Sequence, residues 1–331
     1  MAKFNNIYYK DSIDDPYSFM IESTTGAQPL TASERFELVS SLYGPGNVIC
    51  WFFLLASVLT SWTINPTTAR RDTITNDFIA VLTMPFVAVA HFFHQIHHHQ
   101  SDTNGSLGQL LNSRDRDDVR SVAALEAPLT VCEDFLAWAA VIFAVSARRE
   151  HQKRTATVLT VGWLCVVAGM ILMLAGPSYG STPLVRPFVS QSTAIFGIFL
   201  GWHLLILVVY LVEVVFGLFL TLVRPGAREV ESAVETPSLA RRILWPGRVS
   251  SWMSAFSSVV IGAFSIWIKY GLMYPPEWRF HSFRFIPKSN ANLFDLDQVV
   301  AMLGGLVTLS FSLRDAYKQR KARGARRRAR N

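Results

Sequence analysis

Seven apolar runs, separated by polar segments, dominate the pattern of hydrophobic and polar positions along this chain. A helix needs about 20 apolar residues to cross the hydrocarbon core of a bilayer, and most of the runs approach that length. We therefore predict an all-α polytopic membrane protein, a bundle of seven transmembrane helices. The predicted spans are residues 47–64, 78–96, 128–147, 156–176, 193–223, 250–268 and 297–313.

The predicted spans divide the chain into three parts. Residues 1–46 form a polar N-terminal segment, residues 47–313 the membrane domain, and residues 314–331 a basic tail. Within the first part, Thr31 and Glu34 have the spacing of a capping box, which predicts a helix start. The helix that follows is too short and charged to span, so we expect it to lie at the interface and to stop at Gly44-Pro45-Gly46.

The composition excludes an ordinary soluble protein. The chain of 331 residues is 50% hydrophobic and only 17% charged, whereas soluble domains carry about 25% charged residues. The three cysteines, Cys50, Cys132 and Cys165, all lie inside apolar runs. That placement predicts no disulfide framework and no Cys-based metal site, and it favours small buried apolar side chains.

Charge asymmetry predicts the orientation. Of the 31 Lys and Arg residues, 20 lie in the loops after the first, third and fifth spans and in the tail. Positive residues stay cytoplasmic, so we expect the N-terminus outside or in a lumen and the C-terminus in the cytoplasm. The sequon Asn104-Gly105-Ser106 falls on the predicted outer side, which makes Asn104 a candidate glycosylation site.

The tail and one outer loop suggest partners. Residues 314–331 hold nine Lys or Arg, and beside a membrane each contributes about 1 kcal/mol of attraction to anionic lipid. Arg326-Arg327-Arg328 resembles an arginine-type retention signal, so the endoplasmic reticulum or the plasma membrane is the expected location. The aromatic and basic loop at residues 278–285 indicates an interfacial belt, and no nucleic-acid partner is expected.

Histidines crowd the end of the second span. Five of the eight histidines lie within residues 91–99, and at about 100° per residue His91, His94 and His98 share one helix face. Imidazoles at this spacing can bind zinc or another transition metal, with Asp102 nearby if the helix continues. The alternatives are a proton- or anion-sensitive patch, or an interfacial cluster solvated by head groups and water.

Two adjacent carboxylates, Glu133 and Asp134, lie within the third predicted span. A carboxylate at the centre of a span costs about 2.5–3.5 kcal/mol on insertion scales, and less near the edge. They are placed one to two turns from the outer end, and at most one can point at the bundle axis. They are candidate catalytic acids, proton carriers or metal-site partners of the histidines, or plain interhelical hydrogen-bonding groups.

Further polar residues are candidates inside other spans. His203 and Glu213 fall on adjoining parts of one face of the fifth span, where they can form a relay or a structural network. Asp295 or Asp297 is a natural helix cap at the start of the seventh span, and Asp77 is explained by a helix N-terminus. Small residues recur every four positions in the sixth span, which predicts a close helix contact: Ser254, Ser258 and Gly262.

Two functions remain open on these residues. The first is transport or sensing through the histidine and carboxylate site. The second is a membrane-embedded enzyme, assisted by acid or metal, that acts on an apolar substrate. In span number the chain is similar to integral membrane terpene cyclases, which would imply acid roles for Glu133, Asp134 and Asp297. The seventh span has no lysine for a retinal Schiff base, and receptor signatures are missing at the ends of the third and seventh spans. A small-molecule or lipophilic ligand fits either function.

Overall fold

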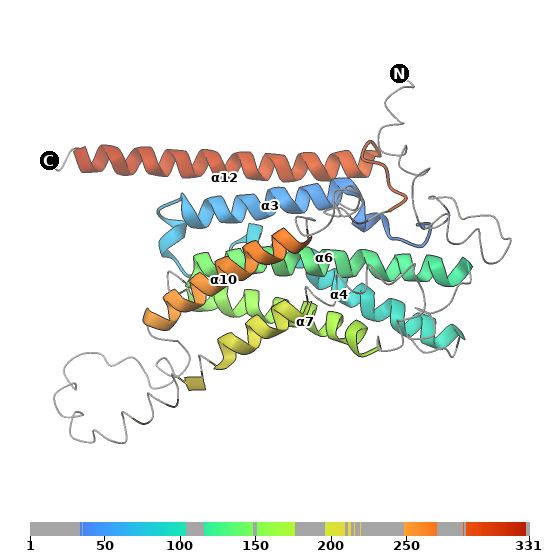
Figure 1. Ribbon diagram of the computed structural model, residues 1–331. Coiled ribbons are helices and arrows are strands. Elements are labelled where there is room, and N and C mark those ends of the chain that lie inside the picture. Colours follow the sequence, from blue (N-terminus) through green and yellow to red (C-terminus); the bar gives the residue numbers. More distant parts are fainter. Residues whose placement is uncertain are drawn as a thin grey trace.

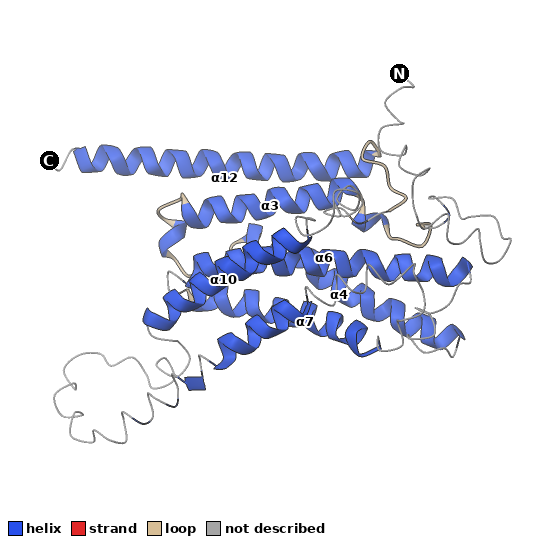
Figure 2. Ribbon diagram, viewed as in Figure 1, coloured by secondary structure: helices blue, strands red, loops and turns tan. Residues whose placement is uncertain are grey.

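The computed structural model describes residues 34, 36–103, 116–147, 151–175, 196–208, 211–212, 215, 219, 248–269, 287 and 289–328. Within these ranges all regular structure is helical, as Figure 2 shows. The principal helices are α3 (Pro45–Thr63), α4 (Asn76–Thr103), α6 (Arg116–Ala147), α7 (Gln152–Ala175), the helix Phe196–Val208, α10 (Arg248–Lys269) and α12 (Leu296–Arg328). Two short 3-10 helices, η2 (Ser41–Tyr43) and η3 (Thr68–Arg70), flank α3.

Five helices are long and apolar enough to cross a membrane. They are α3 and the stretches Asn76–His98 of α4, Arg120–Ser146 of α6, Lys153–Ile171 of α7 and Leu296–Ala325 of α12. Phe196–Val208 and Ala255–Ser265 of α10 are shorter apolar helices. These helices indicate a helical membrane protein. The count of seven spans and the orientation of the termini stay predictions, and Asn104 lies outside the described residues.

Successive helices alternate in direction along the bundle (Figure 1). The indole Nε1 of Trp51 donates to the Val81 carbonyl over 2.8 Å, and Ser57 bonds to Asp77, so α3 and α4 are antiparallel. α12 instead runs parallel to α3 at the edge of the bundle. We call the end where the last turns of α4 carry their histidines the histidine end. The opposite end, where residues 314–328 of α12 lie, is the basic end.

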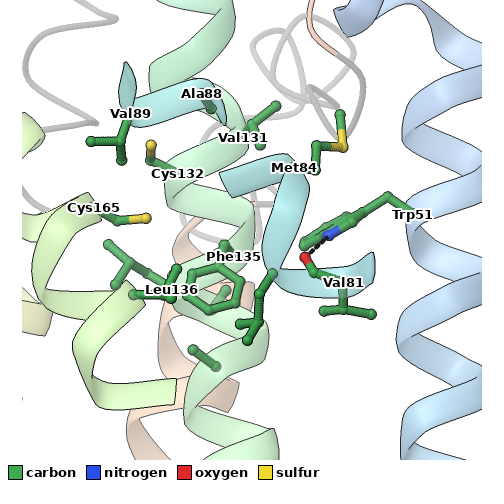
Figure 3. Packing of buried hydrophobic residues seen from close by; sticks show 14 of the residues in the cluster. Trp51, Val81, Met84, Ala88, Val89, Val131, Cys132, Phe135, Leu136 and Cys165 are labelled. Carbon is green, nitrogen blue, oxygen red and sulfur yellow. Dashed lines mark hydrogen bonds between the residues drawn. The ribbon is translucent and has the colours of Figure 1, made fainter. Parts of the chain in front are cut away.

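α6 occupies the middle of the bundle and packs against α4, α7 and α10. Figure 3 shows Cys132 and Phe135 of α6 between residues of α4, such as Met84, and Cys165 of α7. Both thiols are free and buried, which confirms their prediction as small apolar side chains. Gly262 of α10 confirms the predicted close contact, because a Cβ there would stand 3.1 Å from the Cβ of Ala140 on α6.

Two predicted boundaries were wrong at the start of the chain. The expected interfacial helix is not continuous, because the described residues have turns at 36–38 and then only η2. Gly44-Pro45-Gly46 does not end that helix but begins the next one, with Gly44 as N-cap and Pro45 in the first turn of α3. Proline fits there because the first N–H groups of a helix have no intrahelical acceptor.

Two helices are longer than their predicted spans. α6 begins at Arg116 rather than at Pro128, and the proline lies inside the helix. α12 continues without interruption to Arg328, so the tail predicted to start after Leu313 is a helical extension of the last span. A helix of 33 residues is about 50 Å long at 1.5 Å per residue, which exceeds the hydrocarbon core of about 30 Å.

Candidate functional site

Tyr43 of η2 and His91 of α4 are joined at the histidine end. Their rings stack with centroids 5.6 Å apart, and Tyr43 Oη lies 2.9 Å from His91 Nδ1. On the other side of the imidazole, Gln95 Nε2 lies 3.0 Å from His91 Nε2. An amide nitrogen only donates, so His91 Nε2 accepts, and Nδ1 carries the ring proton and donates to Tyr43. A second proton on His91 is compatible with this contact only if the Gln95 amide turns over.

Tyr43 also places this network beside α6. Its side chain is fully buried, and burial raises the pKa of Tyr43 above its ordinary value, with a smaller contribution from the nearby thiol of Cys132. The phenol therefore stays protonated at neutral pH. Cys132 directly precedes Glu133 in α6, so the network reaches the turn of the central helix that carries the carboxylates.

His94, His97 and His98 are on the surface of α4. The rings of His94 and His98 have centroids 6.1 Å apart, and both side chains are exposed, as is that of His97. Within the described ranges no three His, Cys, Asp or Glu side chains gather closely enough to hold a metal ion. Metal binding, by zinc or another ion, at His91, His94 and His98 stays a prediction.

Glu133 and Asp134 are both inside the protein, with 4% and 1% of their side chains exposed. That at most one of the two points at the bundle axis stays a prediction, because α6 has neighbours on several sides and can bury both. Gly262 of α10 packs on Ala137 and Val141 of α6, and Asp134 lies one turn earlier on that same face. Both carboxylates make interactions with their surroundings.

The depth of this pair also differs from the prediction. The apolar stretch of α6 runs from Arg120 to Ser146, so Glu133 lies at its middle, 13 residues from its start. At 1.5 Å per residue this is about 20 Å. His98, by contrast, ends the apolar stretch of α4. The carboxylates and the exposed histidines therefore lie at different depths rather than in one site at the helix ends.

His203 lies deep in the bundle. Its Nδ1 is 2.8 Å from the Phe199 carbonyl oxygen, and its ring contacts Trp163 of α7 with centroids 5.0 Å apart. The predicted partner Glu213 lies outside the described residues. Asp297 is in the first turn of α12, where its carboxylate accepts from the side-chain amide of Gln298. Because α12 begins at Leu296, the residue in the N-cap position is Asp295, the other of the two predicted caps.

Sequence reasoning missed the partners of Asp77. The Ser57 hydroxyl of α3 donates to Asp77 Oδ2 over 2.9 Å, and the Ser312 hydroxyl of α12 approaches the same oxygen to 3.3 Å. The two hydroxyl oxygens are 2.6 Å apart. Asp77 therefore ties three helices together besides starting α4. Serines are common in spans, and no local signal marks these two.

A buried arginine at the basic end was missed as well. The Arg154 guanidinium donates to the carbonyl oxygens of Thr73 and Thr68, lies 3.1 Å from His151 Nδ1, and stacks 4.3 Å above the Trp62 ring. These contacts fix the start of α7 against the segment after α3. The sequence signal was only a charged residue beside a span, which the charge count treated as a loop residue.

Comparisons with known protein families, with curated proteins and with solved structures found no match for this chain. The candidate sites therefore stand on their geometry alone.

Proposed function

We propose that this chain is a membrane transporter or sensor that works by protonation of the α6 carboxyl groups, Glu133 and Asp134. The observation that carries the proposal is the burial of both side chains at the middle of the central apolar helix. Other helices enclose both carboxyl groups, and an ionisable residue within a membrane span marks a functional site by default. A carboxyl group that binds and releases a proton there couples the bundle to the proton concentration.

The network at the histidine end supports a route to these groups. His91, Tyr43 and Gln95 form a hydrogen-bonded chain, and Tyr43 lies near the thiol of Cys132, next to Glu133. Imidazole is the side chain whose ordinary pKa lies nearest to physiological pH. This network therefore places one imidazole and its hydrogen-bonded neighbours between the last turns of α4 and the turn of α6 that carries Glu133.

The test compares amide variants with the wild type in a bilayer. Tryptophan fluorescence of the protein in nanodiscs, recorded from pH 5 to 8, should show a transition in the wild type. Glu133→Gln or Asp134→Asn, or both, should abolish it with normal expression, because an amide keeps the size of the side chain but transfers no proton in this range. Glu37→Gln is the matched control, since Glu37 is exposed and outside the spans.

Internal pH of proteoliposomes that contain a pH-sensitive dye then separates transport from sensing. A transporter should acidify or alkalise the lumen under a membrane potential, and the active amide variant should reduce this rate at least tenfold. A wild type without a pH-dependent transition, or amide variants that keep it, would contradict the proposal.

The second candidate function is a membrane-embedded enzyme that acts on an apolar substrate. The observation that favours it is the imidazole of His203, which lies between the aromatic rings of Trp163 and Trp202. A basic nitrogen among aromatic rings suits acid or base chemistry on a molecule with little polarity of its own. Conversion of an apolar substrate that survives in both α6 amide variants but is lost in His203→Phe would favour the enzyme.

A further inference from the structure

The helix Phe196–Val208 lies on α7 through two aromatic rings, each set over a glycine. Phe196 covers Gly169, where an added Cβ would overlap the ring, and His203 covers Gly162, where an added Cβ would stand 3.2 Å from Nε2. The two rings are seven residues apart, and so are the two glycines. Phe196 and His203 therefore occupy equivalent positions in the packing of this helix on α7, but one is a hydrocarbon ring and the other is an imidazole.

The imidazole leaves a hydrogen-bond acceptor inside the protein. Because the Phe199 carbonyl can only accept, His203 Nδ1 carries the proton of that bond and Nε2 has a free lone pair. His203 is only 3% exposed, and its Nε2 has no hydrogen-bond partner within the part of the chain that the structure describes. A phenylalanine like Phe196 would fill the place without this cost.

A donor without a partner lies on the adjacent residue. The indole Nε1 of Trp202 is buried and unpaired among the described residues, and the Trp202 and His203 ring centroids are 4.8 Å apart. The surrounding side chains are apolar or aromatic, including Leu136 and Trp163. The rings that carry this acceptor and this donor are therefore in contact, in apolar surroundings that suit the hydrocarbon part of a ligand.

We propose that His203 and Trp202 bind the hydroxyl group of a lipophilic alcohol, such as a long-chain alcohol or a sterol, which enters from the bilayer. A hydroxyl both donates and accepts, so one group satisfies His203 Nε2 and Trp202 Nε1 together. A buried water needs two to four polar partners, and here its remaining hydrogen-bonding capacity would face aromatic and aliphatic carbon.

Access comes from the lipid side of this helix. Leu204, Leu205 and Leu207 are exposed on it, and Gly201 has no atom within 4 Å of its missing Cβ. Both polar atoms are covered when the helix lies on α7, so binding requires the helix to shift outward into lipid. The proposal rests on His203 and Trp202 alone and does not depend on the proposed proton coupling.

The experiment uses the full chain in nanodiscs and a photoreactive hexadecanol as the probe. The wild type should be labelled on the helix Phe196–Val208 or on α7, as mass spectrometry of the digested protein will show. Excess hexadecanol should compete, whereas hexadecyl methyl ether should not, because the ether has no proton to give to Nε2. If the ether competes as well as the alcohol, the labelling reports only contact with bulk lipid, and the proposal is overturned.

Variants of the two proposed binding residues test where the hydroxyl group of the probe binds. His203→Phe should lower labelling at least fivefold, whereas His97→Phe, the same exchange at an exposed site, should leave it unchanged. Without alcohol, His203→Phe should melt at or above the wild-type temperature, because it removes an unsatisfied acceptor. Added hexadecanol should raise the melting temperature of the wild type only.

Trp202→Phe removes only the donor and should give an intermediate loss of labelling, which tests the site even if His203→Phe folds poorly. Undiminished labelling in both variants would contradict the assignment.

Discussion

α6 and α12 have nearly the same mean hydropathy over their apolar stretches, but they occupy opposite environments. In the 18-residue apolar core of each stretch, 83% of the residues of α6 are buried within the protein, against 11% in α12. One helix is surrounded by other helices, whereas the other lies at the edge of the bundle (Figure 1). Most of the apolar side chains of α12 are exposed. Mean hydropathy therefore indicates that a helix can cross a membrane, but it does not indicate whether protein or lipid surrounds that helix.

The polar side chains of the two helices follow this difference. α6 carries Glu133 and Asp134 in its apolar middle, where protein groups on several sides can interact with them. α12 confines its buried polar contacts to the stripe that faces α3, at Gln298 and Ser312. Lipid offers no hydrogen-bond partner, so an edge helix can be polar only along its protein contact.

The largest effect should follow from crowding α6. In Gly262→Leu, four added carbons meet Ala140 and the Ala137 carbonyl, which a Cβ alone already approaches to 3.1 and 3.4 Å. Overpacking of this kind should cost about 3 kcal/mol, read as a loss of stability in denaturant titrations in micelles. Ala263→Leu is the matched control because residue 263 is exposed. Equal stability of the two variants would show that α10 does not pack on α6 in this register.

The sequence predicts the apolar elements well because burial in lipid is a local property of each run. All five described long spans fall on runs chosen by hydropathy. It does not reveal that α6 is central, since a central and an edge helix are equally apolar. The start of α6 was also misplaced, because Pro128 reads as a helix start although its ring is accommodated within the helix.

The sequence was sufficient to predict which residues are candidates, but not which residues they contact. Buried carboxylates and histidines stand out in apolar runs, and the structure confirms that Glu133, Asp134 and His203 are buried. Their partners come from distant parts of the chain, as in the contact between Tyr43 and His91. Gln298 lies 252 residues beyond Gly46, whose N–H it accepts. Such pairings depend on helix order in space, which no periodicity encodes.

The next effect concerns the attachment of α12 to α3. Gln298 Oε1 accepts from the backbone N–H groups of Gly46 and Asn47, over 2.9 and 3.2 Å, and caps the first turn of α3 from another helix. Gln298→Leu should cost about 1–3 kcal/mol, because these donors lose their buried acceptor. Gln298→Glu keeps the acceptor and should be milder. Thermal melting in nanodiscs measures both, and equal losses would argue against the cap.

A smaller effect should separate two adjacent glycines of α12. A Cβ on Gly305 would stand 2.8 Å from the Cα of Cys50 on α3, whereas nothing lies within 4 Å of a Cβ on Gly304. Gly305→Ala should therefore cost about 1–2 kcal/mol through separation of the backbones. Gly304→Ala should be neutral or stabilising by up to about 1 kcal/mol, since alanine favours helix. The reverse order in melting temperature would mean that α12 presents another face to α3.

The smallest effect is expected on the exposed side of α12. Leu303 is 48% exposed, so Leu303→Ala removes carbon that contacts lipid rather than protein and should change stability by less than about 0.5 kcal/mol. Leu129 of α6 is fully buried, and there the same exchange leaves a cavity that costs about 2 kcal/mol or more. The stability of both variants should be measured by denaturant titration in the same micelles. Detergent is a fair substitute for the bilayer here, because both solvate the exposed leucine alike. A large loss at Leu303 would reveal that another protein surface, such as a second copy of the chain, covers α12 in the membrane.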